Sequence, residues 1–153
     1  MNLLDRLAQL NFQLPDVSRP GGSYQSVNVR GNIAYVTTQF PVWNEEFRFQ
    51  GKLGDNLTTE DGYKAAALCA LNVLAQIEGN VGFKHVEGLN HIDIYYVGDG
   101  TWDEAPKVAN GASDLFAKVL VDKGKHSRAI FGVAHLPSNF SIGLTASFTL
   151  LSE

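Results

Sequence analysis

The sequence is poor in cysteine and has no long apolar run. Cys69 is the single cysteine among 153 residues, so the chain cannot form an intrachain disulfide. No segment approaches the roughly 18 apolar residues of a transmembrane helix. Asp5 and Arg6 interrupt the apolar N-terminal residues, which is untypical of a secretory signal. We therefore expect a protein of the reducing cytoplasm that has no membrane as a partner.

Clusters that would hold a metal or a nucleic acid are also missing. The four histidines show no paired ligand spacing, and Cys69 has no second cysteine, so we predict no metal site. Twelve basic residues against sixteen acidic ones give a net charge of −4, and the longest basic run is Lys123–His126. A mildly acidic chain is not drawn to phosphate backbones, so we expect no nucleic acid as a partner.

Hydrophobic periodicity predicts one α+β domain over residues 1–153. Leucines at helical spacing predict a short N-terminal helix, which with its loop forms an extension over residues 1–20. Apolar stripes with a period near 3.6 predict two longer helices, which begin near Thr58 and Pro106. Alternating or β-rich segments predict strands over 27–29, 33–36, 47–49, 91–97, 128–134 and 141–150. This order favours a mixed or antiparallel sheet with both main helices on one face.

The last strand predicts that the second face of the sheet is covered as well. Its first alternating set, which we expect to pack under the helices, is Ile142, Leu144, Ala146, Phe148 and Leu150. Its second set is small and neutral, whereas a face open to water usually carries long polar residues. Another copy of the chain would supply the cover. The alternatives are that the N-terminal helix covers this face, or that it is an exposed sheet rich in Thr and Ser.

One charged residue stands in the neutral C-terminal segment. Between Ser127 and Leu151 the only fixed charge belongs to Arg128. An arginine keeps its charge, and an unpaired charge in a partly dry place is costly, so Arg128 needs a partner. Asp93 or Asp114 would serve in an ion pair. A ligand carboxylate or phosphate would serve equally, because both fit a guanidinium with two parallel hydrogen bonds.

Several motifs in fixed order resemble the Rid family of reactive-intermediate deaminases, also called YjgF or L-PSP proteins. The resemblance covers nearly the whole chain and is strongest in its C-terminal block. The motifs are Gly22–Tyr24, Gly31–Asn32, Thr37–Pro41, Gly51–Gly54, Glu60–Ala66, Cys69–Asn72, Pro106–Leu115, His126–Arg128 and Val133–Pro137. The long first helix and the N-terminal extension are similar to the larger, less characterised branch of that family.

The resemblance implies a chorismate-mutase-like α+β fold. It also implies a homotrimer whose sheets form a central barrel, with ligand pockets between neighbouring subunits. Archetypal members hydrolyse 2-aminoacrylate-type enamines and imines to 2-keto acids and ammonia, without metal or cofactor. The expected partners are therefore a small carboxylate of the 2-imino or 2-keto acid type and further copies of the chain.

Matched position by position, the resemblance implies a set of pocket residues. Arg128 matches the arginine that grips the substrate carboxylate in archetypal members. Tyr24 matches a pocket tyrosine, and Asn110 matches a pocket asparagine at the start of the second main helix. Thr37-Thr38 occupies the place of a Ser-Gly pair, and Ile130 stands where cysteine is frequent.

One departure bears directly on catalysis. Gly143 stands where archetypal deaminases carry a glutamate thought to orient the attacking water. A positioned acid or base typically contributes about 10²–10⁴-fold to a rate, so its loss could leave binding without useful turnover. His126 or Tyr24 is a hypothetical substitute. Ser113 and Asp114 lack a nucleophile-elbow motif, so we assign them to the helix surface rather than to a triad with His126.

Three functions follow as hypotheses. The first is a Rid-like enzyme of small-molecule metabolism that binds a carboxylate through Arg128 and hydrolyses enamines or imines. The second is a non-catalytic metabolite-binding or sensor protein that uses the same pocket, and Gly143 favours it. The third is ribonuclease action, against which the net acidity and the absence of a basic aromatic patch argue.

Overall fold

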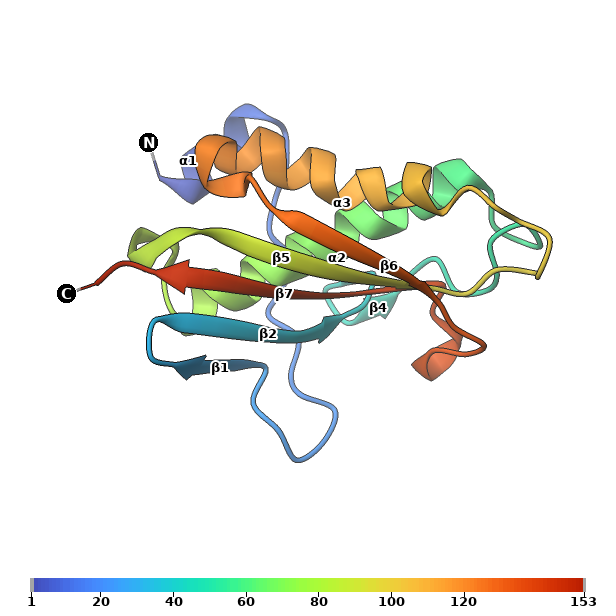
Figure 1. Cartoon of the computed structure of the whole chain (residues 1–153), viewed down its shortest axis with the longest axis horizontal. Coiled ribbons are helices and arrows are strands. Elements are labelled where there is room, and N and C mark those ends of the chain that lie inside the picture. Colours follow the sequence, from blue (N-terminus) through green and yellow to red (C-terminus); the bar gives the residue numbers. More distant parts are fainter. Residues whose placement is uncertain (1, 153) are drawn as a thin grey trace.

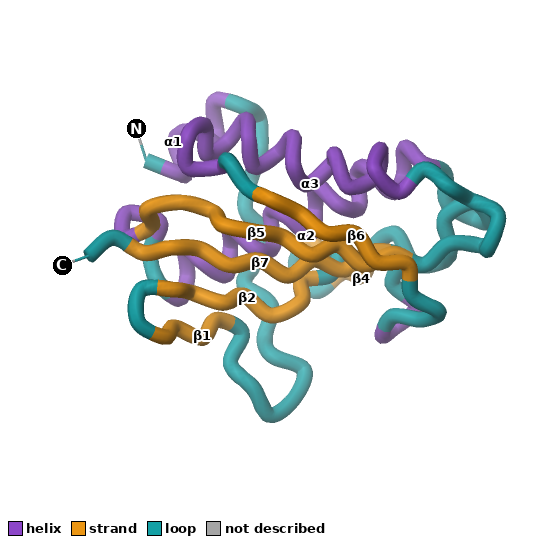
Figure 2. The backbone as a smooth tube through the Cα atoms, in the orientation of Figure 1, coloured by secondary structure: helices purple, strands orange, loops and turns teal. Residues whose placement is uncertain are grey.

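A five-stranded mixed sheet carries the long helices on one of its faces, as the computed structural model of residues 2–152 shows (Figures 1 and 2). Its strand order is β1-β2-β7-β5-β6. The strands are β1 (Val27–Arg30), β2 (Ile33–Gln39), β7 (Ile142–Leu150), β5 (Val86–Tyr96) and β6 (Ser127–Gly132). Only the β5–β6 pair is parallel, and the other pairs in this sheet are antiparallel. The predicted α+β arrangement with a mixed sheet is confirmed.

The helices begin where the sequence places their caps. In α2 (Thr59–Asn80), the Thr58 side chain accepts from the Asp61 amide, and the Asp61 carboxylate accepts from the Thr58 amide. These hydrogen bonds with Thr58 hold the pKa of Asp61 below its ordinary value. α3 (Ala105–Leu120) has Pro106 in its first turn, and α1 (Leu3–Gln9) is capped by the Asn2 side chain. The short 3-10 helices are Phe83–His85, Val121–Gly124 and Pro137–Asn139.

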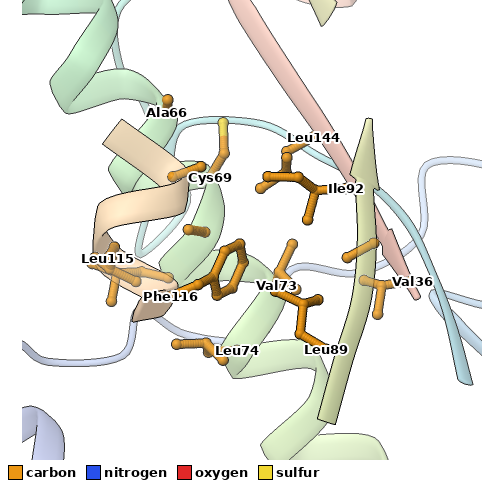
Figure 3. Close-up of a cluster of buried hydrophobic side chains, with 14 of the residues drawn as sticks. Val36, Ala66, Cys69, Val73, Leu74, Leu89, Ile92, Leu115, Phe116 and Leu144 are labelled. Atoms are coloured by element: carbon orange, nitrogen blue, oxygen red, sulfur yellow. The ribbon is translucent and has the colours of Figure 1, made fainter. Parts of the chain in front are cut away.

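The core lies between the two main helices and the inner face of the sheet. Phe116 of α3 points toward Val73 and Leu89 in the middle of this layer (Figure 3). Cys69 is fully buried in the same cluster, and burial raises the pKa of its thiol. A buried thiol with a raised pKa is a packing residue rather than a nucleophile, as its place among alanines and leucines predicts.

The outer face of the sheet stays open within one chain. Here β7 presents Thr145, Ser147 and Thr149, which are half-buried. Tyr35 and Phe131 are 53% and 45% exposed, and the strand register places them on the same face. α1 packs against α3, where the Arg6 guanidinium donates to the Lys118 carbonyl at 3.1 Å. The alternative that the N-terminal helix covers the outer face is therefore wrong.

One predicted strand is much shorter than expected. The segment 47–49 contributes only β4 (Glu46–Phe47), which pairs with β3 (Val42–Trp43) in a separate two-stranded sheet. Phe49 cannot extend it, because its φ of +54° turns the chain away from the extended conformation. The strand predicted over 128–134 likewise ends at Gly132, and the one predicted over 91–97 begins earlier, at Val86.

Gly111 allows α2 and α3 to approach closely, which gives a test of the helix packing. A Cβ at this position would overlap the Tyr63 carbonyl oxygen. We expect Gly111→Ala to lower the free energy of unfolding by about 1–3 kcal/mol, although alanine normally exceeds glycine in helix propensity. Urea unfolding monitored by circular dichroism measures this change.

Gly79→Ala is the matched control for that substitution. Its Cβ would meet only the half-exposed Val17 side chain, so the free energy of unfolding should stay the same or rise. An equal loss of stability in both variants would contradict the close contact between the helices.

Candidate functional site

Arg128 extends from the edge strand β6 toward the second turn of α3. Its Cα partner in β5 is Ile92, which faces the core, so Arg128 lies on the helical side of the sheet rather than on its outer face. Nη1 donates to Asn110 Oδ1 at 2.8 Å and to Ser113 Oγ at 3.1 Å. A longer contact of 3.5 Å joins Nη2 to the Pro106 carbonyl. The helix thus holds the guanidinium through three neutral oxygens.

His126 fixes the serine that holds Arg128. Its Nδ1 lies 2.6 Å from the Gly124 carbonyl, which can only accept, so Nδ1 carries a proton and donates. Its Nε2 lies 2.9 Å from Ser113 Oγ. With the neutral ring, Ser113 donates to Nε2 and accepts from Arg128, and the chain of hydrogen bonds closes without conflict. Both ring nitrogens of His126 are occupied by protein groups in this arrangement.

Neither aspartate that the sequence offered as an ion-pair partner contacts Arg128. The Asp114 carboxylate accepts from the Tyr63 hydroxyl at 2.7 Å, and this hydrogen bond raises the pKa of Tyr63. Asp93 lies 2.9 Å from His91 Nε2 on the outer face. Among residues 2–152, no ion pair includes Arg128. The ion-pair alternative is therefore wrong, and two of the five guanidinium N–H groups, on Nε and Nη2, stay available to an anion.

A second group of predicted residues lines a hollow of about 520 Å³ near the other edge of the sheet. Tyr24, Thr37 and Thr38 contribute to it, together with the loop over residues 16–21. The Tyr24 hydroxyl accepts from the Gly21 amide at 3.0 Å and keeps its own proton free for a further hydrogen bond.

The structure therefore divides the seven predicted residues. One set, the Arg128 group, meets at the β6 edge and consists of Arg128, Asn110 and His126. The other set, the Tyr24 group, lies by β2 and consists of Tyr24, Thr37 and Thr38. Three strand spacings of about 4.8 Å separate β2 from β6, which amounts to about 14 Å. Ile130 lies on the helical side of β6 and packs against the core. One chain by itself does not bring the two groups together.

The departure at Gly143 is coupled to the one at Thr38. A Cβ at position 143 would lie 3.0 Å from Thr38 Cγ2 and 3.1 Å from the Phe40 ring. The Thr38 methyl thus occupies the space next to this position, where the resemblance gives archetypal members a glycine beside their glutamate. A side chain at position 143 would therefore compete for space with the Thr38 methyl.

A larger hollow of about 950 Å³ lies at the far end of the helices and contains none of the predicted residues. It is lined by α1 together with residues around Phe83 and Val121. Its arginine, Arg6, already donates to the end of α3.

No metal or membrane element emerges in the part of the chain that the structure describes. Residues 2–152 contain no group of three histidine, cysteine or acidic side chains placed to hold a metal ion. Over the same residues, no helix is both long and apolar enough to span a membrane.

Sequence reasoning missed Ser113 as a site residue by assigning it to the helix surface. The sequence signal that could have found Ser113 is its distance from Asn110, because residues three apart in a helix share one face. The aromatic wall of the smaller hollow, formed by Phe40, Phe47 and Phe140, had no such signal, since its members come from three separate segments.

Comparisons with known proteins agree with this architecture. A family model described as "YjgF/chorismate mutase-like, putative endoribonuclease" matches residues 4–151. Protein TCP17 of Trypanosoma cruzi is 32% identical over 142 residues, which cover 92% of this chain and 89% of that protein.

Two crystal structures are similar over nearly the full chain. A "putative endoribonuclease" from Shewanella oneidensis is 27% identical with a TM-score of 0.95, covering 98% of this chain and 100% of that one. A protein of unknown function from Agrobacterium tumefaciens is 30% identical with a TM-score of 0.90, covering 97% and 92%. The chain therefore belongs to the YjgF/chorismate mutase-like, or Rid, family, and it has the α+β fold of that family.

Proposed function

We propose that the protein binds a small carboxylate of the 2-imino or 2-oxo acid type through Arg128. The observation that carries this proposal is a half-buried guanidinium whose protein partners are all neutral. Asn110 and Ser113 fix Nη1 of Arg128, so the opposite edge of the guanidinium, formed by Nε and Nη2, is oriented before a ligand arrives. A carboxylate would meet this edge with two parallel, charge-assisted hydrogen bonds.

A second copy of the chain completes this pocket in our proposal. The Tyr24 group and the Arg128 group lie by different strands, so a neighbouring copy is needed to place them around one ligand. The open outer face, with the small neutral residues of β7 and the exposed rings of Tyr35 and Phe131, is suited to packing against other copies. Its Asp93 carboxylate is already held by His91 and Thr145. A closed ring of three copies with this face turned inward satisfies both conditions.

Hydrolysis of the bound imine is the second candidate, and the free proton of the Tyr24 hydroxyl favours it. In that reaction water adds to the carbon of the C=N bond, the C–N bond breaks, and the products are a 2-oxo acid and ammonia. Position 143 offers no carboxylate to orient this water, so binding is the function that the geometry supports best. RNA cleavage gains no support from a site with one arginine in a chain of net charge −4.

Loss of the guanidinium should weaken carboxylate binding. Because a charge-assisted pair is worth about 1.5–3 kcal/mol, we expect Arg128→Gln to weaken the binding of 2-oxobutyrate about 10- to 100-fold. Isothermal titration calorimetry measures this affinity. Lys64→Gln, which removes an exposed cation of α2 on the helical side of the sheet, serves as the control, and equal weakening in both variants would refute the role of Arg128.

The assembly itself is tested by charging the outer face. We expect wild-type protein to sediment with three times the mass of the 16.7 kDa chain. Ser147→Glu would place an additional carboxylate of each copy in the seam between copies, so it should raise the dissociation constant of the trimer at least about tenfold. Gln9→Glu on the exposed side of α1 should leave the mass unchanged. A wild-type chain that sediments as a monomer would overturn the shared pocket.

The coupled positions 38 and 143 predict a gain of activity. Gly143→Glu alone should lower the free energy of unfolding by about 1–3 kcal/mol, because its side chain collides with Thr38 and Phe40. Thr38→Gly combined with Gly143→Glu should recover part of that loss and raise ammonia release from 2-aminoacrylate by about 10²–10⁴-fold. Thr38→Gly alone is the control and should not gain activity. A double variant no faster than wild type would show that the missing carboxylate is not what limits turnover.

A further inference from the structure

Three phenylalanine rings form one wall of the hollow that Tyr24 and Thr38 line. Phe40 and Phe140 stack with ring centroids 4.8 Å apart and planes 9° from parallel. Phe47 leans on Phe140 with a centroid distance of 4.9 Å. Phe140 is 3% exposed, whereas Phe47 is 50% exposed. A half-exposed ring that stands beside one buried and one partly buried ring in a concave place offers a surface that another apolar group would cover.

The hollow of a single chain has room for more than a three-carbon acid. A cavity of about 150 Å³ is enough to bind benzene in an apolar protein interior. The hollow here measures about 520 Å³, so it has room for an aromatic ring and for a short acidic tail.

The residues that line the hollow suit the apolar part of a ligand better than its carboxylate. Thr37, Thr38 and Tyr24 offer neutral hydroxyl groups, and the charged residues Asp16, Arg19 and Glu45 are exposed. Two acids against one arginine do not attract a carboxylate to this lining. The ligand's acid group therefore pairs with Arg128 of another copy, and the rest of the ligand contacts the phenylalanine wall.

Gly143 lies next to the Phe40 ring of this wall. It faces Tyr95 in the β5–β7 register, and Tyr95 stacks on Phe131 with centroids 5.4 Å apart. On its other side, the Phe40 ring occupies the space next to the glycine. A glutamate here would place a charge between aromatic rings, and glycine avoids the cost of desolvating it.

We propose that the ligand carries an aromatic or similarly bulky apolar group next to its carboxylate, as in a phenylpyruvate-type 2-oxo or 2-imino acid, and that Phe47 selects it. This inference rests on the proposed carboxylate pocket and names the substrate class of that pocket. The partly buried Phe40 ring, supported by the buried Phe140 ring stacked on it, forms the floor for the ligand's ring, and Phe47 closes over its edge.

Calorimetric titration of the full chain with phenylpyruvate and with 2-oxobutyrate tests this proposal. We expect phenylpyruvate to bind about 10- to 100-fold more tightly, because its ring buries apolar area that the ethyl group of 2-oxobutyrate does not. Phe47→Ala should remove most of this preference while leaving the affinity for 2-oxobutyrate within about twofold, since the carboxylate contacts remain. Phe47 is half exposed, so this variant is expected to fold, and circular dichroism verifies it.

Leu4→Ala, an equally exposed apolar position on α1, is the matched control and should keep the full preference. Equal affinities for the two acids, both lost in Arg128→Gln, would overturn the aromatic substrate class and leave the carboxylate pocket standing. A preference that survives Phe47→Ala would also overturn it, because the ring would then bind elsewhere. If neither acid binds wild-type protein, or if Arg128→Gln weakens neither, the proposed function itself fails.

Discussion

A guanidinium held by neutral oxygens is the interaction on which the candidate site depends. Arg128 cannot lose its charge, and its partners in the chain are an amide oxygen, a hydroxyl and a more distant carbonyl. Ser113 and His126 orient these bonds, so they fix the direction of the group without cancelling its charge. A site that is rigid and still uncompensated is prepared for an anion, because little ordering remains to be done when the anion binds.

The position of this arginine also explains why the fold needs more than one copy to make a pocket. β6 and β2 are separated by two central strands, and the hydroxyl-lined hollow lies by β2. On the open face β7 presents small neutral residues, whereas β5 presents His91, Asp93 and Tyr95, so long charged side chains that would keep copies apart are few in these two strands. Site geometry and surface composition therefore favour the same assembly.

Position 143 links the fold to the proposed choice of ligand. The Thr38 methyl and the Phe40 ring fill the space next to it, so a single exchange to glutamate would be sterically opposed. The Phe40 ring also belongs to the apolar wall of the nearby hollow. Replacement of a polar catalytic group by an aromatic wall would change both the rate of hydrolysis and the shape of the acid that binds.

The sequence by itself determined the elements and the arginine. Three of these features can be read locally: the cap formed by Thr58 and Asp61, the alternation in β7, and the lone charge at Arg128. The first two follow from the geometry of helix and strand, and the third follows from composition. The family motifs identified Asn110 and Tyr24, but they did not say that these residues lie apart within one chain. Only the tertiary structure decided that Arg128 turns to α3 rather than to Asp93 or Asp114, and that Phe40, Phe47 and Phe140 meet in one wall. Such contacts join segments that are distant in the sequence, and their partners are fixed by strand order and packing, which no local period encodes.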